Sequence, residues 1–320
     1  MGASIKAVNW KWKARVQNAV AMLPLSDHIY YAMQRNVGRF RPGRSNHLEW
    51  FDAALTFVKW IKGAGHEVKG RSFLEVGTGH YVSVPMALWL CGASEVVTVD
   101  LNKYLADALV AETIEFVRNN QDEVVTAFGS EAEEPLFQER LQHLIKLEGG
   151  ASELLRLANI KYISPADAAR LDFPDESFDF HISHAVFEHI PPDVIAAILT
   201  EARRLLKPQG LLVHVIDPSD HFAHDDTSIT AINFLQFSER EWKRWAGNKF
   251  MYHNRLRAFE YVKLFEGAGV RILRLSQAID ESSLNVLRNG FQLDERFQPI
   301  VIEKLAVTSL ILMGTFYPEE

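Results

Sequence analysis

Two glycines and two acidic residues stand where a protein could hold a nucleotide-like ligand. The stretch FLEVGTGHYVSV, residues 73–84, reads as an apolar strand that runs into a loop containing Gly77 and Gly79. Glycines at such a turn let the chain bend tightly and let a ligand approach the backbone. Glu75 lies near the end of this strand, and Asp100 ends the next one, VVTVD, roughly twenty residues later, where an acid accepts hydrogen bonds from ribose hydroxyls.

The same loop argues against a pyrophosphate. A dinucleotide fingerprint has a third small residue three positions after the second glycine, and Val82 stands there. The loop also lacks the Lys-Ser/Thr pair of a P-loop. The carboxylate of Glu75 would repel a phosphate but suits a ligand with an amine and positive charge. The pattern favours a ligand with a ribose, a cationic end and no phosphate, and S-adenosylmethionine meets all three conditions.

Histidines follow the expected fourth strand, in HISHAVFEHI, residues 181–190. Histidine is suited to act as a general base because its unperturbed pKa of about 6.5 lies near working pH. Strand alternation puts His181 and Ser183 on one face, and His184 at the carboxyl end, facing the cleft. His184 and His189 are candidates for a base or an acceptor contact; a hydrogen-bonded structural histidine is the alternative. Glu188 and His189 also fit the packed start of the next helix.

A second cluster of titratable residues follows the fifth strand, in HVIDPSDHFAHDD, residues 214–226. Its histidines and aspartates could bind a divalent metal. They could instead form an acceptor-binding lid with His221 or His224 as base, or a solvated loop. We take His221 as the third catalytic candidate and assign no metal ligand.

Alternating strand and helix signals begin near residue 72 and predict an α/β fold. Parallel strands joined by helical crossovers give one sheet with helices on both faces. The expected strands are 72–76, 95–100, 160–164, 178–183, 211–217, 270–276 and 307–316, with a turn PQG before the fifth. Residues 1–70 read as a helical N-terminal extension, and residues 71–320 as the α/β domain, with insertions at about 120–159 and 217–255.

The insertion at 217–255 is rich in aromatic residues and follows the carboxyl end of a strand, where ligands bind in such sheets. It could close over an organic acceptor, or its aromatic rings could pack onto the sheet. The N-terminal helices would form the opposite wall, where Arg35, Arg39, Arg41 and Arg44 could meet an anionic acceptor or stay solvated. The aromatic and basic residues from Trp10 to Arg15 fit a docking helix or a weak contact with a membrane surface.

Composition limits the class of protein. The 320 residues carry a formal charge of −7 and 48% hydrophobic residues, which favours a large core and argues against nucleic-acid binding. The single cysteine, Cys91, fits a reducing, cytoplasmic compartment and is expected to pack in the core. We see neither a secretory signal nor an apolar run long enough to span a membrane.

Four segments in this order resemble the class I S-adenosylmethionine-dependent methyltransferases: LEVGTG, VVTVD, ADAARLDFPDESFDFHISHAVFEHI and EARRLLKPQGLLVHV. The resemblance implies a seven-stranded, mostly parallel sheet whose last strand, 307–316, is antiparallel. It implies cofactor contacts from Glu75, Gly77, Thr78, Gly79, Asp100, Leu101, Asn102, Asp167, Ala168 and Ser183. Tyr81 departs from the family, which often has a third glycine there.

The resemblance implies an S-adenosylmethionine-dependent methyltransferase, and we expect methylation at oxygen of a small-molecule, sugar or lipid-linked acceptor. A non-catalytic S-adenosylmethionine-binding module, for interaction or membrane-surface contact, is the alternative from another class. A nicotinamide-dependent dehydrogenase is a further alternative, against which Glu75 and Val82 count. The sequence indicates neither the acceptor nor the oligomeric state.

Overall fold

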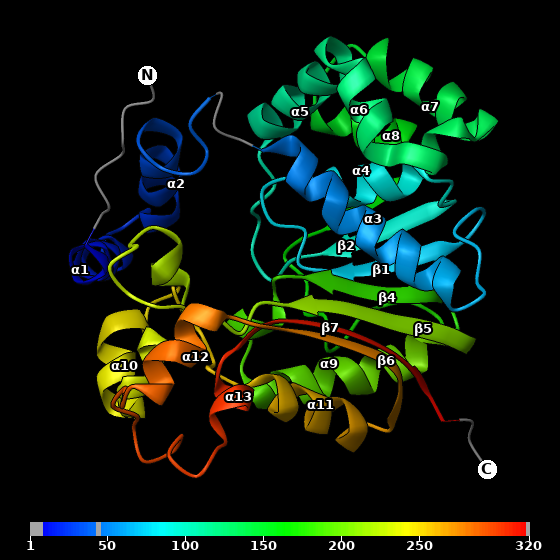
Figure 1. Cartoon of the computed structure of the whole chain (residues 1–320). Helices are drawn as coiled ribbons and strands as arrows, with labels where there is room; N and C mark the ends of the chain where they lie inside the picture. The colour runs from blue at the N-terminus through cyan, green and yellow to red at the C-terminus, as the bar shows by residue number, and fades with distance from the viewer. Residues whose placement is uncertain (1–8, 43–45, 318–320) are drawn as a thin grey trace.

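The structure is a computed structural model that describes residues 9–42 and 46–317. Its centre is a seven-stranded sheet with the order β3-β2-β1-β4-β5-β7-β6 (Figure 1). The strands are β1 (Ser72–Val76), β2 (Glu95–Val99), β3 (Ile160–Ile163), β4 (Phe178–His184), β5 (Leu206–Ile216), β6 (Val270–Ile279) and β7 (Val307–Phe316). Strands β1 to β5 pair in parallel, whereas β7 runs antiparallel to both β5 and β6. The predicted fold class and the antiparallel last strand are confirmed.

Helices cover both faces of the sheet, because strand side chains alternate between them. On one face Phe73, Val96 and Ile182 pack against the helices α3 to α8. These are α3 (His47–Gly63), α4 (Ser83–Leu90), α5 (Asp107–Asn119), α6 (Gln121–Phe128), α7 (Pro135–Ile145) and α8 (Ala151–Leu157). On the other face Leu74 and Val97 pack against α9 (Pro192–Leu205) and α11 (Ala258–Gly267).

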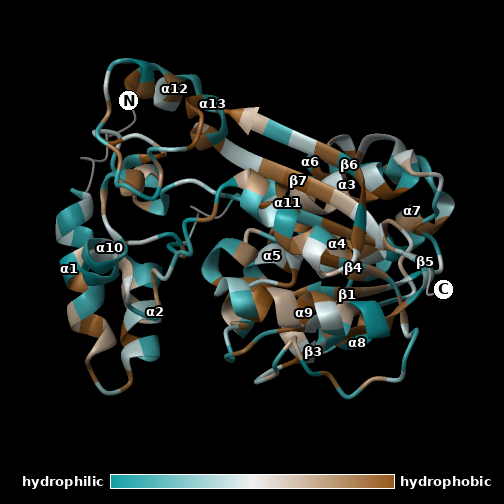
Figure 2. Ribbon diagram, turned by 90° about the horizontal axis from the view of Figure 1, so that it is seen from below, coloured by the Kyte–Doolittle hydropathy of each residue, from teal (hydrophilic) through white to brown (hydrophobic). Residues whose placement is uncertain are grey.

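A separate group of helices lies beside the sheet and forms a side lobe with its own apolar cluster. Figures 1 and 2 both place α1, α2 and α10 together, apart from the sheet. The side lobe comprises α1 (Trp10–Ala21), α2 (Ser26–Asn36), α10 (Glu239–Ala246), α12 (Glu281–Arg288) and α13 (Ile302–Leu305). Trp10 lies at the centre of this cluster. The residue is 4% exposed, and its ring centre lies 5.5 Å from that of Phe222 and 5.2 Å from that of Trp245.

The packing of the side lobe bears on what the sequence predicts for the 217–255 insertion and for the N-terminal extension. Most apolar residues of the 217–255 insertion pack in the side lobe rather than onto the sheet. Trp10 docks against them, and its backbone N–H donates to Asp226 Oδ2 at 2.8 Å, whereas Trp12 is 63% exposed. The apolar face of α3, with Phe51, Phe57 and Ile61, belongs to the core of the sheet. The expected boundary near residue 70 therefore does not coincide with a break in packing.

Two local features differ from the sequence-based prediction. The PQG turn lies inside β5, because the pairing with β4 shifts from Phe178–Leu206 to Phe180–Leu211 and Gln209 adopts a φ of 66°. The segment between β6 and β7 was not expected to contain helices, yet it supplies α12 and α13. Among the described residues, no helix is long and apolar enough to cross a membrane.

Candidate functional site

The chemistry-bearing residues meet at the carboxyl edge of the parallel strands. The register aligns Glu75 with Thr98 on β2 and with Ile182 on β4. His184 aligns with Val215 on β5. Ligands of open α/β sheets bind outside this edge. We call the tips of β1, β2 and β3 with their loops the cofactor half, and the tips of β4 and β5 with their loops the acceptor half.

The glycine loop needs both of its glycines, for different reasons. Gly77 has a φ of +87°, and a Cβ there would lie 2.4 Å from Val186 Cγ2, in the turn that follows β4. Gly79 has a φ of +68°, and a Cβ there would meet nothing within 4 Å. Gly77 is thus required by conformation and by close packing, whereas Gly79 leaves room at the backbone where a ligand can approach.

Two buried carboxyls flank this loop. Burial raises the pKa of Glu75 to about 8, although Thr98 donates to Glu75 Oε2 at 2.5 Å. Burial also raises the pKa of Asp100 to about 7, opposed chiefly by the Gly79 N–H, which donates to Asp100 Oδ2 at 3.0 Å. The hydroxyls of Thr78 and Thr98 are hydrogen-bonded to each other. These acids fit a ribose and a cationic group and do not fit a phosphate.

The other expected cofactor contacts surround Asp100. Its backbone carbonyl accepts from the N–H of Ala166, which brings the 164–169 loop beside it. Leu101 is 70% exposed, and Asn102 Nδ2 donates to the Tyr104 hydroxyl at 3.1 Å. Asp167 is exposed, and its Oδ1 accepts from the N–H of Ala169, two residues later; Ala168, between them, is half-buried. The cofactor half thus gathers most of the residues that the resemblance implies.

Ser183 points elsewhere. Its side chain is fully buried, and its Oγ lies 2.7 Å from His214 Nδ1. His214 Nε2 lies 3.2 Å from His181 Nδ1, so the three side chains form one buried chain on the α9 and α11 face. Alternation predicted the shared face of His181 and Ser183 correctly. The Ser183 hydroxyl bonds His214 on the face that α9 and α11 cover.

Tyr81 explains the departure from the family at the third glycine. Its ring is 8% exposed and lies 6.0 Å from the rings of Phe40 and Trp50. Trp50, on α3, also meets the His184 ring edge-on at 6.0 Å. Tyr81 is thus a packing residue that joins the glycine loop to the N-terminal helices. Phe40, Trp50 and Tyr81 form an aromatic wall here, which Trp50 extends to His184.

Two of the four arginines expected near this wall contact other residues of the protein. Arg35 donates to Glu112 Oε1 at 2.7 Å, and the Arg39 guanidinium lies 5.7 Å from the Trp50 ring centre. Arg41 is exposed, and Arg44 lies outside the described residues. Only Arg39 is placed beside a residue that contacts His184.

His184 is half-buried, and its Nδ1 has no hydrogen-bond partner among the described residues. Burial lowers the pKa of His184, while Glu49 and Asp217 act in the opposite direction. The ring is therefore neutral near pH 7 and has a nitrogen able to accept a proton.

Glu188 is the least expected residue of the acceptor half. It is fully buried in a short 3-10 helix, Phe187–His189, and neither carboxyl oxygen has a hydrogen-bond partner in the part of the chain that the structure describes. Burial raises its pKa well above the usual value, and the backbone amides of Glu188 and Asp217, which act in the opposite direction, oppose this only in part. Its Oε1 lies 4.0 Å from His221 Nε2.

Asp217 contacts two histidines beside Glu188. Its Oδ2 lies 3.3 Å from His221 Nε2 and 3.4 Å from His224 Nε2. Burial would raise the pKa of Asp217, but the contacts with His221 and His224 hold it well below its usual range. His189, whose Nδ1 lies 2.8 Å from the Tyr252 carbonyl, has its ring centre 4.8 Å from that of His221. Glu188 and His189 of the first cluster therefore lie beside Asp217, His221 and His224 of the second.

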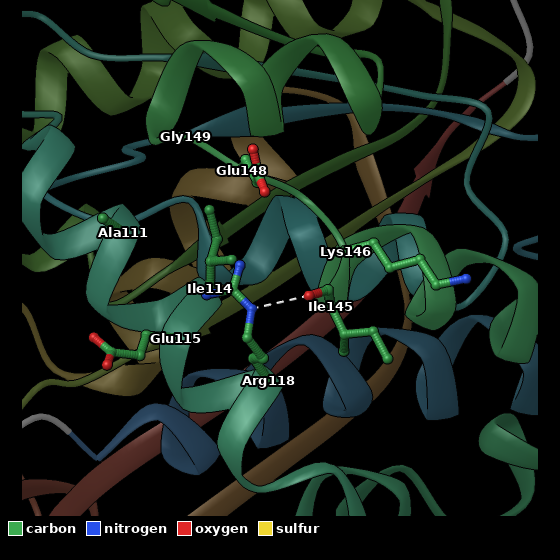
Figure 3. Close-up of a pocket in the computed structure, with 8 residues that line it drawn as sticks. All are labelled: Ala111, Ile114, Glu115, Arg118, Ile145, Lys146, Glu148 and Gly149. Carbon is green, nitrogen blue, oxygen red and sulfur yellow. Dashed lines mark hydrogen bonds between the residues drawn. The ribbon is translucent and has the colours of Figure 1, made fainter.

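A hollow of about 660 Å³ lies elsewhere, between α5 and the end of α7 (Figure 3). Arg118 crosses it and donates to the Ile145 carbonyl at 2.9 Å. It has a mixed lining of charged and aliphatic residues and none of the carboxylates and histidines described above. Its position away from the strand tips argues against a role in the chemistry.

Sequence reasoning missed residues that act through long-range contacts. Thr98 holds Glu75, Val186 packs on Gly77, and Trp50 joins Tyr81 to His184. The strand-end position of Thr98, level with Glu75, was a usable signal. Nothing local to Trp50 or Val186 indicated their partners.

Comparisons with known proteins agree with this geometry. The family model described as a methyltransferase domain matches residues 138–214, from within α7 to within β5. A search of curated proteins finds no match.

Solved structures with a similar fold share little sequence with this chain. A magnesium protoporphyrin IX methyltransferase from Synechocystis, solved with S-adenosylhomocysteine, is 14% identical with a TM-score of 0.47, covering 97% of this chain and 100% of its own. A proposed methyltransferase from Bacillus halodurans is 17% identical with a TM-score of 0.44, covering 82% and 100%. A methyltransferase from Methanosarcina mazei is 16% identical with a TM-score of 0.42, covering 78% and 94%. Likeness at this level says nothing about the acceptor.

The assignment therefore depends on the domain match, the strand order and the acids at the cofactor half. A mostly parallel seven-stranded sheet with an antiparallel last strand is the architecture that the resemblance implied. The match to a methyltransferase domain over residues 138–214, together with this strand order, supports a class I S-adenosylmethionine-dependent methyltransferase with S-adenosylmethionine as its cofactor.

Proposed function

We propose that this protein transfers a methyl group from S-adenosylmethionine to an oxygen atom of a small-molecule, sugar or lipid-linked acceptor. The observation that carries this proposal is His184, a neutral, half-buried histidine with an unpartnered Nδ1 at the tip of the strand next to β1. A hydroxyl acceptor needs a base to take its proton, whereas an amine acceptor can already be neutral. A histidine so placed favours oxygen.

The cofactor half supplies binding and orientation. Bound S-adenosylmethionine supplies a methyl group that is already activated on a sulfonium. The carboxyl of Asp100, held by the Gly79 N–H, would accept hydrogen bonds from ribose hydroxyls, and that of Glu75, held by Thr98, would face positive charge. The open backbone at Gly79 allows close approach.

The acceptor half supplies the base and the wall. Nδ1 of His184 would accept the hydroxyl proton while the acceptor oxygen bonds to the methyl carbon and the bond from that carbon to sulfur breaks, which leaves S-adenosylhomocysteine. Trp50 and Tyr81 form an aromatic surface beside it, which suits an organic acceptor and keeps water away. His189 and His221 lie around Glu188 and would hold the acceptor rather than take its proton.

The proposal is tested by following release of S-adenosylhomocysteine with a panel of phenols, sugars, carboxylic acids and amines, each with methyl-labelled cofactor. Transfer to oxygen predicts a labelled ether or ester, which alkaline hydrolysis distinguishes because only the ester releases methanol. Label on nitrogen or carbon would overturn the oxygen assignment.

The matched variants are His184→Asn and His28→Asn. The first should lower kcat by about 10²–10⁴-fold, the usual contribution of a general base, with unchanged cofactor affinity. His28, exposed on α2, should have no effect. Tight cofactor binding without transfer to any acceptor would favour a non-catalytic module, and preferential binding of a nicotinamide cofactor would favour a dehydrogenase.

A further inference from the structure

Glu188 raises a question that methyl transfer alone does not answer. A carboxyl group buried without hydrogen-bond partners is unfavourable, and such groups are normally paired or bind a metal. Both Glu188 oxygens are buried and without an aligned hydrogen bond among the described residues, and so is His221 Nε2, which lies 4.0 Å from Glu188 Oε1 and 3.3 Å from Asp217 Oδ2. These orphan groups face each other.

The surrounding side chains are those that bind metals. Glu188, His189 and His221 offer ligand atoms that all lie within 4.8 Å of one another, and so do Asp217, His221 and His224. Ligands about 2.1 Å from one ion lie roughly 3.0–3.5 Å apart in tetrahedral or octahedral sites. The Asp217 contacts with His221 and His224, at 3.3 and 3.4 Å, fall in this range.

Contacts behind the cluster orient its members. The Tyr252 carbonyl lies 2.8 Å from His189 Nδ1, which leaves Nε2 as the nitrogen free to bind. Asp217 Oδ1 accepts from the N–H of Ser219 at 2.9 Å, which turns Oδ2 toward the histidines. The buried guanidinium of Arg257 donates to the Pro218 carbonyl at 2.6 Å and so fixes the loop beside Asp217. Metal-binding histidines and carboxylates commonly have such supports.

We infer that Glu188, His189 and His221 form the centre of a binding site for one divalent first-row transition metal, completed by Asp217 or His224 beside His221. Imidazole nitrogens with carboxylates suit Zn²⁺, Fe²⁺, Co²⁺ and Mn²⁺, whereas Mg²⁺ and Ca²⁺ prefer oxygen ligands alone. The ligands come from two strand tips, since Glu188 follows β4 and Asp217 follows β5.

The site adjoins the contact between the two halves. Val186, two residues before Glu188, packs on Gly77. A metal at this place would meet an acceptor oxygen and lower the pKa of its hydroxyl. That role rests on the proposed function, whereas metal binding itself does not.

Metal binding is tested with the full chain, first dialysed against a chelator and then titrated with Co²⁺ and, by calorimetry, with Zn²⁺. The wild-type protein should bind one equivalent and develop the visible absorption of protein-bound Co²⁺. Glu188→Gln, which keeps the side-chain volume, should weaken binding at least about 10-fold, and His221→Ala about 100-fold. His143→Ala, an exposed histidine on α7, should bind as the wild type does.

Each outcome decides the inference. Absence of a stoichiometric Co²⁺ signal, or equal affinity in wild type and Glu188→Gln, would overturn it. Circular dichroism and S-adenosylmethionine affinity report whether each variant is folded; if His221→Ala does not fold, Glu188→Gln alone carries the test. Metal binding that persists in a protein without methyl transfer would refute the proposed function and leave the metal site standing.

Discussion

The cofactor half and the acceptor half lie side by side at one sheet edge but satisfy their polar groups differently. In the cofactor half, Glu75 and Asp100 accept hydrogen bonds from Thr98 and Gly79, which lie close by on adjacent strands and loops. In the acceptor half, Glu188 and His184 are buried or half-buried with unpartnered atoms. The first half is largely preformed for a ligand of fixed chemistry. The second holds unsatisfied groups that a metal or an acceptor would satisfy.

The support of the two halves also differs. The cofactor half lies on the sheet and its covering helices, whereas the acceptor half borders the side lobe, in which Trp10 packs with residues from after β5 and between β6 and β7. A substitution in the side lobe should therefore lower the stability of that lobe without changing the affinity for S-adenosylmethionine.

Trp10→Ala should produce the largest effect. Removing a buried tryptophan costs about 3–5 kcal/mol, here in the side lobe, while S-adenosylmethionine affinity should stay near the wild-type value. Hydrogen exchange of α1 and α10, with calorimetry of cofactor binding, measures both. Trp12→Ala, at a residue 63% exposed, is the control and should change stability by no more than about 0.5 kcal/mol. Loss of cofactor binding in Trp10→Ala would contradict this separation.

Gly77→Ala tests the contact between the halves. The new Cβ would lie 2.4 Å from Val186 Cγ2 at a φ of +87°, so strain and overlap should lower the free energy of unfolding by roughly 2–4 kcal/mol. Gly79→Ala, with similar φ but no neighbour, should cost only about 1–2 kcal/mol. Urea unfolding of both, and of Gly77→Ala with Val186→Ala, separates strain from overlap. If Val186→Ala restores none of the stability that Gly77→Ala loses, the close contact with Val186 is not the cause of that loss.

Asp100→Asn should weaken S-adenosylmethionine binding by roughly 10- to 100-fold, because a hydrogen bond to a charged group contributes about 1.5–3 kcal/mol. Calorimetry gives the change, and Co²⁺ binding at the acceptor half should be unaffected. Asp172→Asn, at an exposed loop residue, is the matched control. Affinity equal to that of the wild type would remove Asp100 from the cofactor site.

The pH dependence of cofactor binding should be the smallest of these effects. The pKa of Asp100 is about 7 and that of Glu75 about 8, so both carboxyls are partly protonated near pH 7 in the free protein. A cationic, hydrogen-bonding ligand favours their ionised forms, so binding releases protons and affinity rises with pH until about pH 8. Each proton released gives at most a tenfold change per pH unit, about 1.4 kcal/mol. Heats of binding at pH 7 in two buffers of different ionisation enthalpy would reveal the release, and identical heats would contradict it.

The sequence predicts the cofactor half well because its signals are local. Gly77 follows a strand directly, and Asp100 ends the next strand, so topology alone brings them together. Ser183 shows the limit of such reasoning. Alternation gives the shared face of two side chains but not which face is covered, and His214 on the neighbouring strand takes the Ser183 hydroxyl.

The acceptor half could be predicted only in part. The histidines were recognised as candidates, but the approach of Glu188 to His221 depends on how two loops pack, and no periodic pattern encodes that. The helices α12 and α13 were missed because their segment is short and lies between two strands that pair with each other. Their apolar residues are buried in the same cluster as Trp10, a long-range contact that the local sequence does not indicate.

The apolar cluster around Trp10 also sets an order of events during synthesis. It joins residues from Trp10 to Ala306, almost the whole length of the chain. Parallel strands β1 to β4 can pair once residue 184 has left the ribosome, whereas α1 must wait for the last hundred residues before its buried face has a partner. A nascent chain arrested before residue 222 would therefore expose the tryptophan face of α1, which is the surface that a chaperone would encounter.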